Sequence, residues 1–282
     1  AQVVADLDAL LALGLDGVVI ATPSALHADQ AIRALEADCA VFCQKPLGRT
    51  EAEVRAVVDA ARAADRLLAV DLSYRFTQGM QRVRERIAAG DLGRVFAVDL
   101  VFHNAYGPDK AWFRDPALSG GGCVMDLGVH LVDLALWALD FPQVTAVTSH
   151  LYAGGEPLGH DRSRVEDFAV ATLTLATGAV VRLACSWNLP AGREAVIEAS
   201  FHGERAGGAL RNVDGSFFDF TAEITRGSDG REPLASPPDA WGGRAAVDWA
   251  RRLAGGGRFG SDAEALVNTA AVLDAIYRET RS

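Results

Sequence analysis

Lysine is rare in this chain of 282 residues, and one of its two lysines stands where an amine could do chemistry. Lys45 follows an apolar run, in Cys43-Gln44-Lys45-Pro46, whereas Lys110 falls in a polar loop; every other basic residue apart from histidine is arginine. A desolvated lysine can release its proton, which an arginine in a protein cannot do. Lys45 is therefore a candidate for proton transfer, and a chance surface amine is the alternative.

A second candidate set lies on an apolar segment near 120 to 139 that begins with Gly120-Gly121-Gly122. At 100° per residue, Asp126, His130 and Asp133 fall on one side of a helix. Asp126 is expected to hydrogen-bond the His130 imidazole, to fix its tautomer and to stabilise its cation, as an acid–base pair requires. The glycines favour a functional interpretation, because they allow the backbone to approach a ligand closely.

Three other interpretations of this polar stripe stay open. It could be the solvated face of an ordinary amphipathic helix. It could bind a metal ion through two carboxylates and an imidazole, although no second histidine or cysteine pair stands nearby, and we predict no metal. Asp126 could also be structural and accept hydrogen bonds from the backbone amides of the glycine turn.

The first third of the chain alternates between predicted strands and helices. Strands are expected at 16–22, 39–43 and 67–72, and helices from about 6 to 13, from Pro23 to about 37, and from Thr50 to about 65. Strand–helix–strand order with short links predicts a parallel, doubly wound sheet. Ligands of such sheets bind at the carboxyl ends of the strands, where Thr22-Pro23 and Gln44-Lys45-Pro46 fall.

Beyond Arg94 the pattern changes to long alternating runs, which predict a mostly antiparallel sheet. The expected strands are 95–102, 144–151, 168–175, 180–187, 195–201 and 217–224, with helices near 239–254 and 261–280. The predicted fold class is α/β plus α+β. Residues 1–74 form a partial Rossmann-type domain, and residues 75–282 form an α+β substrate domain whose last helix could return to the first.

Composition narrows the classes of partner. A net charge of -10 offers no basic stripe for nucleic acid. The four cysteines match neither a zinc motif nor a disulfide framework, which indicates a reducing cytoplasm. Acidic residues interrupt the apolar stretches, so no membrane-spanning helix is expected.

Several motifs occur together in a characteristic order. They are Ala21-Thr22-Pro23 with His27, Cys43-Gln44-Lys45-Pro46-Leu47, Ser73-Tyr74-Arg75-Phe76, Gly90-Asp91-Leu92-Gly93, the segment from Trp112 to Asp115, and Gly120-Gly121-Gly122 with Asp126, Gly128, His130 and Asp133. Over nearly its whole length the chain resembles the glucose-fructose oxidoreductase and inositol dehydrogenase (Gfo/Idh/MocA) family. The order and spacing of the motifs carry the resemblance.

The resemblance implies a dehydrogenase that uses NAD or NADP and acts on a sugar or polyol. It implies Lys45, His130 and Asp126 as catalytic residues. The implied cofactor-binding residues are Thr22, Pro23, His27, Gln44, Lys45 and Arg75, and the implied substrate-binding residues are Lys45, His103, Asn104, Trp112, Arg114, Asp126 and His130. It also implies a homo-oligomer formed through the C-terminal sheet.

The chain departs from the family pattern in two ways. Gln44 stands where most relatives have glutamate, so a charge beside Lys45 is missing. No Gly-x-Gly-x-x-Gly follows a first strand, because the first βαβ unit of a Rossmann domain is absent. We expect the sequence to be part of a longer chain, since otherwise the strand near 18–21 would keep an unpaired edge.

The leading hypothesis is a nicotinamide-dependent oxidoreductase in which His130 and Lys45 handle the proton of the substrate hydroxyl. One alternative is a lyase or glycosidase that oxidises its substrate transiently with the same residues. Others are a non-catalytic protein that senses a sugar or dinucleotide, and an inactive fragment.

Overall fold

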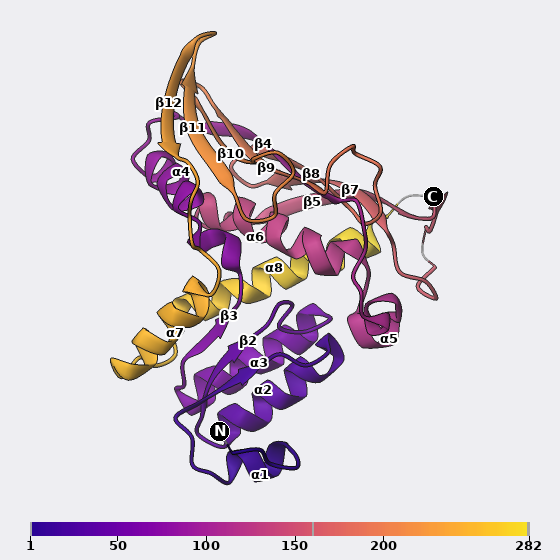
Figure 1. Cartoon of the computed structure of the whole chain (residues 1–282), viewed down its shortest axis with the longest axis vertical. Coiled ribbons are helices and arrows are strands. Elements are labelled where there is room, and N and C mark those ends of the chain that lie inside the picture. The colour runs from indigo at the N-terminus through magenta and orange to yellow at the C-terminus, as the bar shows by residue number, and fades with distance from the viewer. Residues whose placement is uncertain (1, 160, 281–282) are drawn as a thin grey trace.

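Two separate sheets organise the chain, a small parallel one and a large, mostly antiparallel one (Figure 1). The structure is a computed structural model that describes residues 2–159 and 161–280. Helices fill the space between the two sheets, and they cover one face of the large sheet while its other face stays open.

The small sheet is built from the first third of the chain. Its elements are α1 (Leu7–Leu11), β1 (Gly17–Ile20), a 3-10 turn (Ser24–Leu26), α2 (His27–Glu36), β2 (Ala40–Cys43), α3 (Glu51–Ala64) and β3 (Leu68–Val70). The strands lie in the order β1-β2-β3 and pair in parallel, as the strand–helix alternation predicts. The predicted Rossmann-type sheet is therefore confirmed.

Local sequence explains where these elements begin and end. The Thr50 hydroxyl accepts a hydrogen bond from Glu53 N and caps α3, and Asp65 ends that helix in a left-handed conformation. All four residues of β2 are buried, as expected for a strand that is covered on both faces. β1 lies at an edge of the sheet, and its Val19 is 60% exposed.

The large sheet follows a short 3-10 helix (Ser73–Phe76) and α4 (Gln78–Ala88). Its strands are β4 (Val95–Asn104), β5 (Val144–Ala153), β6 (Glu156–Pro157), β7 (Phe168–Leu175), β8 (Val180–Ser186), β9 (Ala195–Gly203), β10 (Gly207–Asn212), β11 (Phe220–Arg226) and β12 (Gly230–Ala235). They lie in the order β12-β11-β10-β9-β4-β8-β7-β5-β6. The β4–β8 pair is parallel and the other described pairs are antiparallel, so the prediction of a mostly antiparallel sheet is confirmed.

Three of these strands, β6, β10 and β12, were not predicted; β6 is only two residues long. Of the two longer ones, β10 begins with two glycines and β12 contains a proline and charged residues, so neither of these two has a strong strand propensity. Antiparallel pairing stabilises both as strands: β10 pairs with β9 and β11, and β12 pairs with β11.

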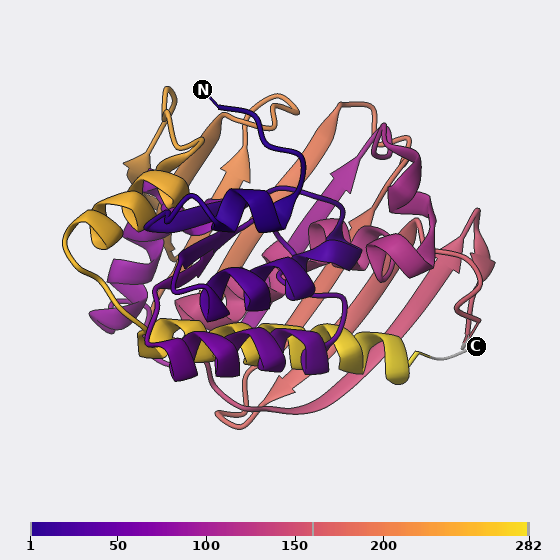
Figure 2. The same cartoon turned by 90° about the horizontal axis from the view of Figure 1, so that it is seen from below.

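The remaining helices lie between the two sheets. They are a 3-10 turn (Ala111–Arg114), α5 (Pro116–Ser119), a π-helical turn (Val124–Gly128), α6 (Val129–Ala138), α7 (Arg244–Ala254) and α8 (Ser261–Arg278). α8 runs beside α3 and also packs on α6 and β5 (Figure 2). The amide of Glu51 at the start of α3 donates to the Asp274 carboxylate on α8 (2.9 Å), so the last helix contacts both parts of the molecule.

The segment Pro116–Ala138 is long and apolar enough to pass a test for a membrane span, contrary to our expectation from its acidic residues. However, 94% of its most apolar window is buried inside the protein. α6 is a core helix, and all ten of its residues are buried.

Candidate active site

The Lys45 amine lies in an ion pair with Asp126. Its Nζ donates to Asp126 Oδ1 (2.6 Å) and to Asp126 O (2.7 Å). The side chains of Lys45 and Asp126 are 19% and 15% exposed, so the pair is mostly desolvated and still reachable. Lys45 sits after the carboxyl end of β2 and Asp126 on the π-helical turn, so the two parts of the chain meet at this pair.

Asp126 has a second partner, Trp187, which no sequence motif indicated. The indole Nε1 donates to Asp126 Oδ2 (3.0 Å), so both carboxylate oxygens accept hydrogen bonds. The predicted hydrogen bond from His130 to Asp126 is wrong, since no such bond exists among the described residues. Asp126 therefore orients Lys45 rather than His130.

The π-helical turn explains why the helix prediction failed at this point. Our expectation assumed 100° per residue, but Val129 N bonds back to Val124 O, five residues earlier. This wider turn changes the angle between residues on either side of it. Asp126 lies within the turn and His130 lies beyond it, so the two side chains separate.

His130 is buried beside Lys45. It is 7% exposed, and the Tyr74 and His130 rings pack edge-to-face with their centroids 4.9 Å apart. Burial, followed by the nearby charge of Lys45, holds the pKa of His130 well below its usual value. The imidazole is therefore neutral at neutral pH and can accept a proton.

Asp133 and Arg75 form a separate structural ion pair. Arg75 Nε donates to Asp133 Oδ2 (2.6 Å), and its guanidinium packs against the rings of Trp137 and Phe141. Burial raises the pKa of Asp133, with Arg75 acting against the shift. Asp133 is 1% exposed, so the interpretation of the stripe as a solvated face is wrong.

The three glycines make room for protein side chains and backbone. A Cβ on Gly121 would lie 1.9 Å from the Tyr277 hydroxyl, and one on Gly122 would lie 1.9 Å from Glu166 O. Gly120 has a positive φ of 83°. Internal packing thus requires these glycines, which removes the argument that they point to a ligand.

Glu166 holds the glycine turn, and sequence reasoning missed it. Its Oε1 accepts hydrogen bonds from Gly122 N and Val124 N (2.9 Å each) and from the Tyr277 hydroxyl (2.8 Å). Burial raises the pKa of Glu166, although these hydrogen bonds oppose the shift. Glu166 fills the structural role that we had considered for Asp126, and only the fold brings it to residues more than forty positions away.

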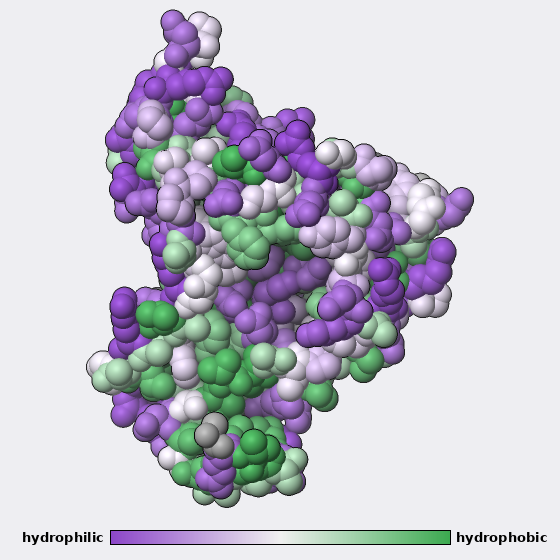
Figure 3. Space-filling view, viewed as in Figure 1, coloured by the Kyte–Doolittle hydropathy of each residue, from purple (hydrophilic) through white to green (hydrophobic). Residues whose placement is uncertain are grey.

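The Lys45–Asp126 pair opens onto a small cleft. It is lined by Ser24, Lys45, Pro46, Trp112, Phe113, Ser119, Gly121, Gly122, Met125 and Asp126. The fold thus brings Trp112 to the site, and the Phe113 ring stacks on the Trp112 ring with a centroid separation of 3.8 Å. In the space-filling view, hydrophilic side chains gather in a hollow between the lower and upper parts of the molecule (Figure 3).

The other predicted substrate residues lie farther out. Arg114 packs over the ring of Trp187 (6.0 Å). His103 stacks on Phe168, and its Nδ1 contacts the Ser186 hydroxyl (2.7 Å). Asn104, next along β4, is 9% exposed. Of the predicted substrate residues, His103, Asn104, Arg114 and His130 do not line the cleft that contains Lys45.

The residues predicted for the cofactor meet at the carboxyl edge of the small sheet. Thr22 Oγ1 donates to Gln30 Oε1 (2.7 Å), and Gln44 Nε2 donates to Asp71 Oδ2 (2.7 Å). His27 is buried, and its ring nitrogens contact two backbone carbonyls. Pro23 adjoins Thr22, whereas the guanidinium of Arg75 is held by Asp133.

One buried atom at this edge has an unfilled hydrogen-bonding capacity. Asp71 Oδ1 follows β3 and has no hydrogen-bond partner among the described residues. A donor group of a bound molecule would satisfy it. This acceptor suits a hydroxyl or amide group of a bound cofactor. In the described part of the chain, no group of three His, Cys, Asp or Glu side chains could hold a metal ion.

Comparisons with known proteins give the family. Residues 1–72 match the model of the oxidoreductase family with an NAD-binding Rossmann fold, and residues 80–209 match that of the GFO/IDH/MocA C-terminal domain. D-xylose 1-dehydrogenase (NADP(+)) 2 of Haloferax volcanii is 30% identical over 273 residues, which cover 95% of this chain and 79% of that protein. The chain belongs to the Gfo/Idh/MocA family. The predicted resemblance is confirmed.

Further relatives within the family agree. D-glucoside 3-dehydrogenase of Escherichia coli strain K12 is 31% identical over 71% of this chain, and the match spans 60% of that enzyme. Levoglucosan dehydrogenase of Pseudarthrobacter phenanthrenivorans is 32% identical over 66% of this chain, and the match spans 53% of that enzyme. The chain thus spans little more than half the length of these relatives.

A solved structure has the same fold over nearly the whole chain. GenD2 from gentamicin A biosynthesis, determined in complex with NAD, gives a TM-score of 0.80 at 26% identity. The match covers 99% of this chain and 80% of GenD2. The arrangement of a small parallel sheet and a large open sheet is therefore that of the family.

Proposed function

We propose that this protein is an NAD- or NADP-dependent oxidoreductase that acts on a hydroxyl carbon of a sugar or polyol. The observation that carries the proposal is the Lys45–Asp126 ion pair, because it places a desolvated, still accessible amine at the carboxyl edge of an NAD-binding sheet. The names of the relatives above, dehydrogenases of D-xylose, D-glucosides and levoglucosan, support a carbohydrate substrate.

Thr22, Pro23 and Gln44 would hold the nicotinamide end of the cofactor beside Lys45. The bound nicotinamide supplies hydride transfer to or from its ring carbon C4. The residues of the chain supply position and proton handling. The Lys45 ammonium donates a hydrogen bond to the reacting oxygen and stabilises negative charge that develops there, while Asp126 and Trp187 keep the amine in place.

His130 completes the proton-handling set. Burial and Lys45 lower its pKa, so the imidazole is neutral and has a lone pair for the hydroxyl proton during oxidation, but it holds that proton weakly and returns it readily during reduction. The proposal differs from our sequence-based mechanism in one respect: Asp126 acts on Lys45 and not on His130.

A spectrophotometric assay tests the function. The protein, purified with any residues that precede this sequence in its reading frame, is mixed with NAD⁺ or NADP⁺ and a panel of aldoses, glycosides and inositols. Net reduction of the nicotinamide with at least one sugar is expected. Release of a leaving group without net nicotinamide reduction would indicate the lyase instead, and cofactor binding without turnover would indicate a sensing protein.

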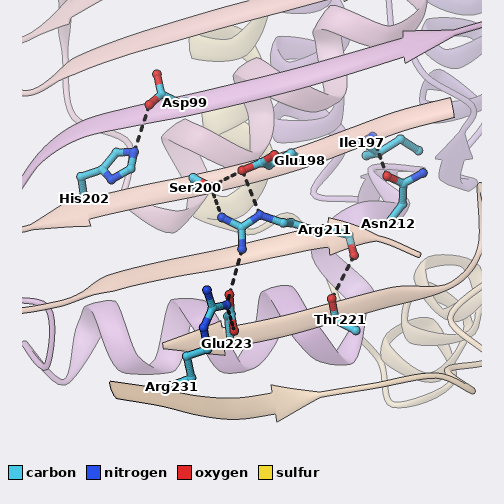
Figure 4. A network of polar contacts seen from close by, with 10 residues as sticks. All are labelled: Asp99, Ile197, Glu198, Ser200, His202, Arg211, Asn212, Thr221, Glu223 and Arg231. Atoms are coloured by element: carbon cyan, nitrogen blue, oxygen red, sulfur yellow. Dashed lines mark hydrogen bonds and ion pairs between the residues drawn. The ribbon is translucent and has the colours of Figure 1, made fainter. Parts of the chain in front are cut away.

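We also propose that the open face of the large sheet packs against a second copy of the chain. Polar contacts cover much of this face: Arg211 pairs with Glu198 and Glu223, Arg231 pairs with Glu223, and the His202 ring contacts Asp99 (Figure 4). Sedimentation equilibrium should give at least a dimer, and a monomer at micromolar concentration would contradict this.

The four cysteines are free and buried, which supports a cytoplasmic location.

A further inference from the structure

His27 lies between two backbone carbonyl groups and reaches both of them. It is the first residue of α2 and is 1% exposed. Its Nδ1 lies 2.7 Å from Pro46 O, and its Nε2 lies 2.7 Å from Thr22 O. Both distances are those of good hydrogen bonds.

These two contacts restrict the protonation state of the ring. A carbonyl oxygen only accepts hydrogen bonds, whereas a neutral imidazole has one N–H and one lone pair. In either neutral tautomer, one ring nitrogen would face a carbonyl oxygen with no hydrogen between them. Turning the ring by 180° would place carbon atoms at both oxygens and lose both bonds. Only the imidazolium donates to both.

We infer that His27 is a positioning residue that carries a proton on each ring nitrogen and, in this cationic form, ties the turn after β1 to the turn after β2. The backbone ladder between these strands ends where Gln44 N donates to Ile20 O (2.8 Å). Beyond that point the His27 side chain takes over the connection. Pro46 directly follows Lys45, so the tie restricts the backbone that carries the amine, whatever reaction the amine serves.

Several charged side chains near these segments have partners of their own. Among the charged side chains on α2, after β2 and at the start of α5, Asp29 pairs with Arg33, Lys45 with Asp126 and Arg49 with Glu53, while Asp115 caps α5. The positive end of the α2 dipole opposes a cation at the first residue of that helix. The two charge-assisted hydrogen bonds must outweigh this opposition.

Nitrogen NMR of the protein labelled with [15N]histidine tests the protonation state without a change of sequence. At neutral pH both ring nitrogens of His27 should resonate at the protonated position. His103 is an internal control: burial lowers its pKa, so it should show one protonated and one unprotonated nitrogen. An unprotonated nitrogen on His27 at neutral pH would overturn the inference.

Hydrogen exchange tests the positioning role separately. In His27→Gln, the backbone amides of Thr22, Ser24, Gln44, Lys45 and Leu47 should exchange several-fold faster than in the wild type. The matched control His103→Gln, on the large sheet, should leave both turns unchanged. Unchanged exchange at both turns in a folded His27→Gln protein would remove the positioning role. If that variant does not fold, the NMR measurement on the wild type still decides the protonation state.

Discussion

At the scale of single residues, the unexpected member of the site is Trp187. Its indole N–H is the second donor to Asp126, whose other carboxylate oxygen binds Lys45. Removing this donor leaves the carboxylate less well fixed and the amine less well placed. A hydrogen bond to a charged group contributes on the order of 1.5–3 kcal/mol, so its loss is large enough to measure in turnover.

Trp187→Phe keeps an aromatic ring but loses the N–H. We expect kcat to fall roughly 10-fold, since part of the bond energy is recovered by relaxation. Trp249→Phe is the matched control, because the Trp249 Nε1 is buried with no hydrogen-bond partner among the described residues. Steady-state kinetics decide the matter, and equal kcat values for the two variants would mean that Trp187 does not act through Asp126.

The lowered pKa of His130 predicts how the free energy of unfolding depends on pH. Its pKa is lowered in the folded state, so below the unfolded value of about 6.5 the unfolded chain binds more protons. The stability contributed by neutral His130 is present above that pH and is lost as the pH falls, by at most about 1.4 kcal/mol per pH unit. The free energy of unfolding of His130→Gln, measured with urea, should fall less steeply below this pH than that of the wild type. Parallel curves would show that His130 titrates normally in the folded protein.

At the scale of elements, the glycine turn and the π-helical turn position Asp126. Gly122→Ala would drive a Cβ into the backbone of Glu166, which cannot move as a flexible side chain could. We expect a loss of about 2–3 kcal/mol in the free energy of unfolding. Gly128→Ala is the control, since its nearest contact is 3.4 Å and alanine favours a helix. Thermal denaturation measures this difference, and a lower melting temperature for Gly128→Ala than for Gly122→Ala would contradict this account of the turn.

The same elements show how far sequence reasoning reached. Continuous apolar runs and Thr50 predicted the small sheet and α3, because those signals are local. The partner of Asp126 could not be predicted, since a π-helical turn leaves no pattern in the sequence and breaks the assumed angle per residue. Trp187 and Glu166 were missed because only the tertiary fold brings them to the glycine turn and Asp126.

At the scale of the whole molecule, α8 joins the two sheets. It packs on α3 beside the small sheet and on α6 and β5 of the large one. We therefore expect one cooperative unfolding transition, with the far-ultraviolet circular dichroism and tryptophan fluorescence curves coinciding. Two resolved transitions would mean that the small sheet and the large sheet unfold independently.

The central claim concerns Lys45, and the chain provides a matched control in its only other lysine, Lys110. The decisive measurement is the rate of nicotinamide reduction with the best substrate for Lys45→Arg beside Lys110→Arg. Both variants keep their positive charge, but the larger, planar guanidinium of arginine does not fit the site of the amine against Asp126. We predict that Lys45→Arg loses roughly 10²–10⁴-fold in kcat while Lys110→Arg keeps the wild-type rate. A Lys45→Arg protein with most of its activity would contradict the account.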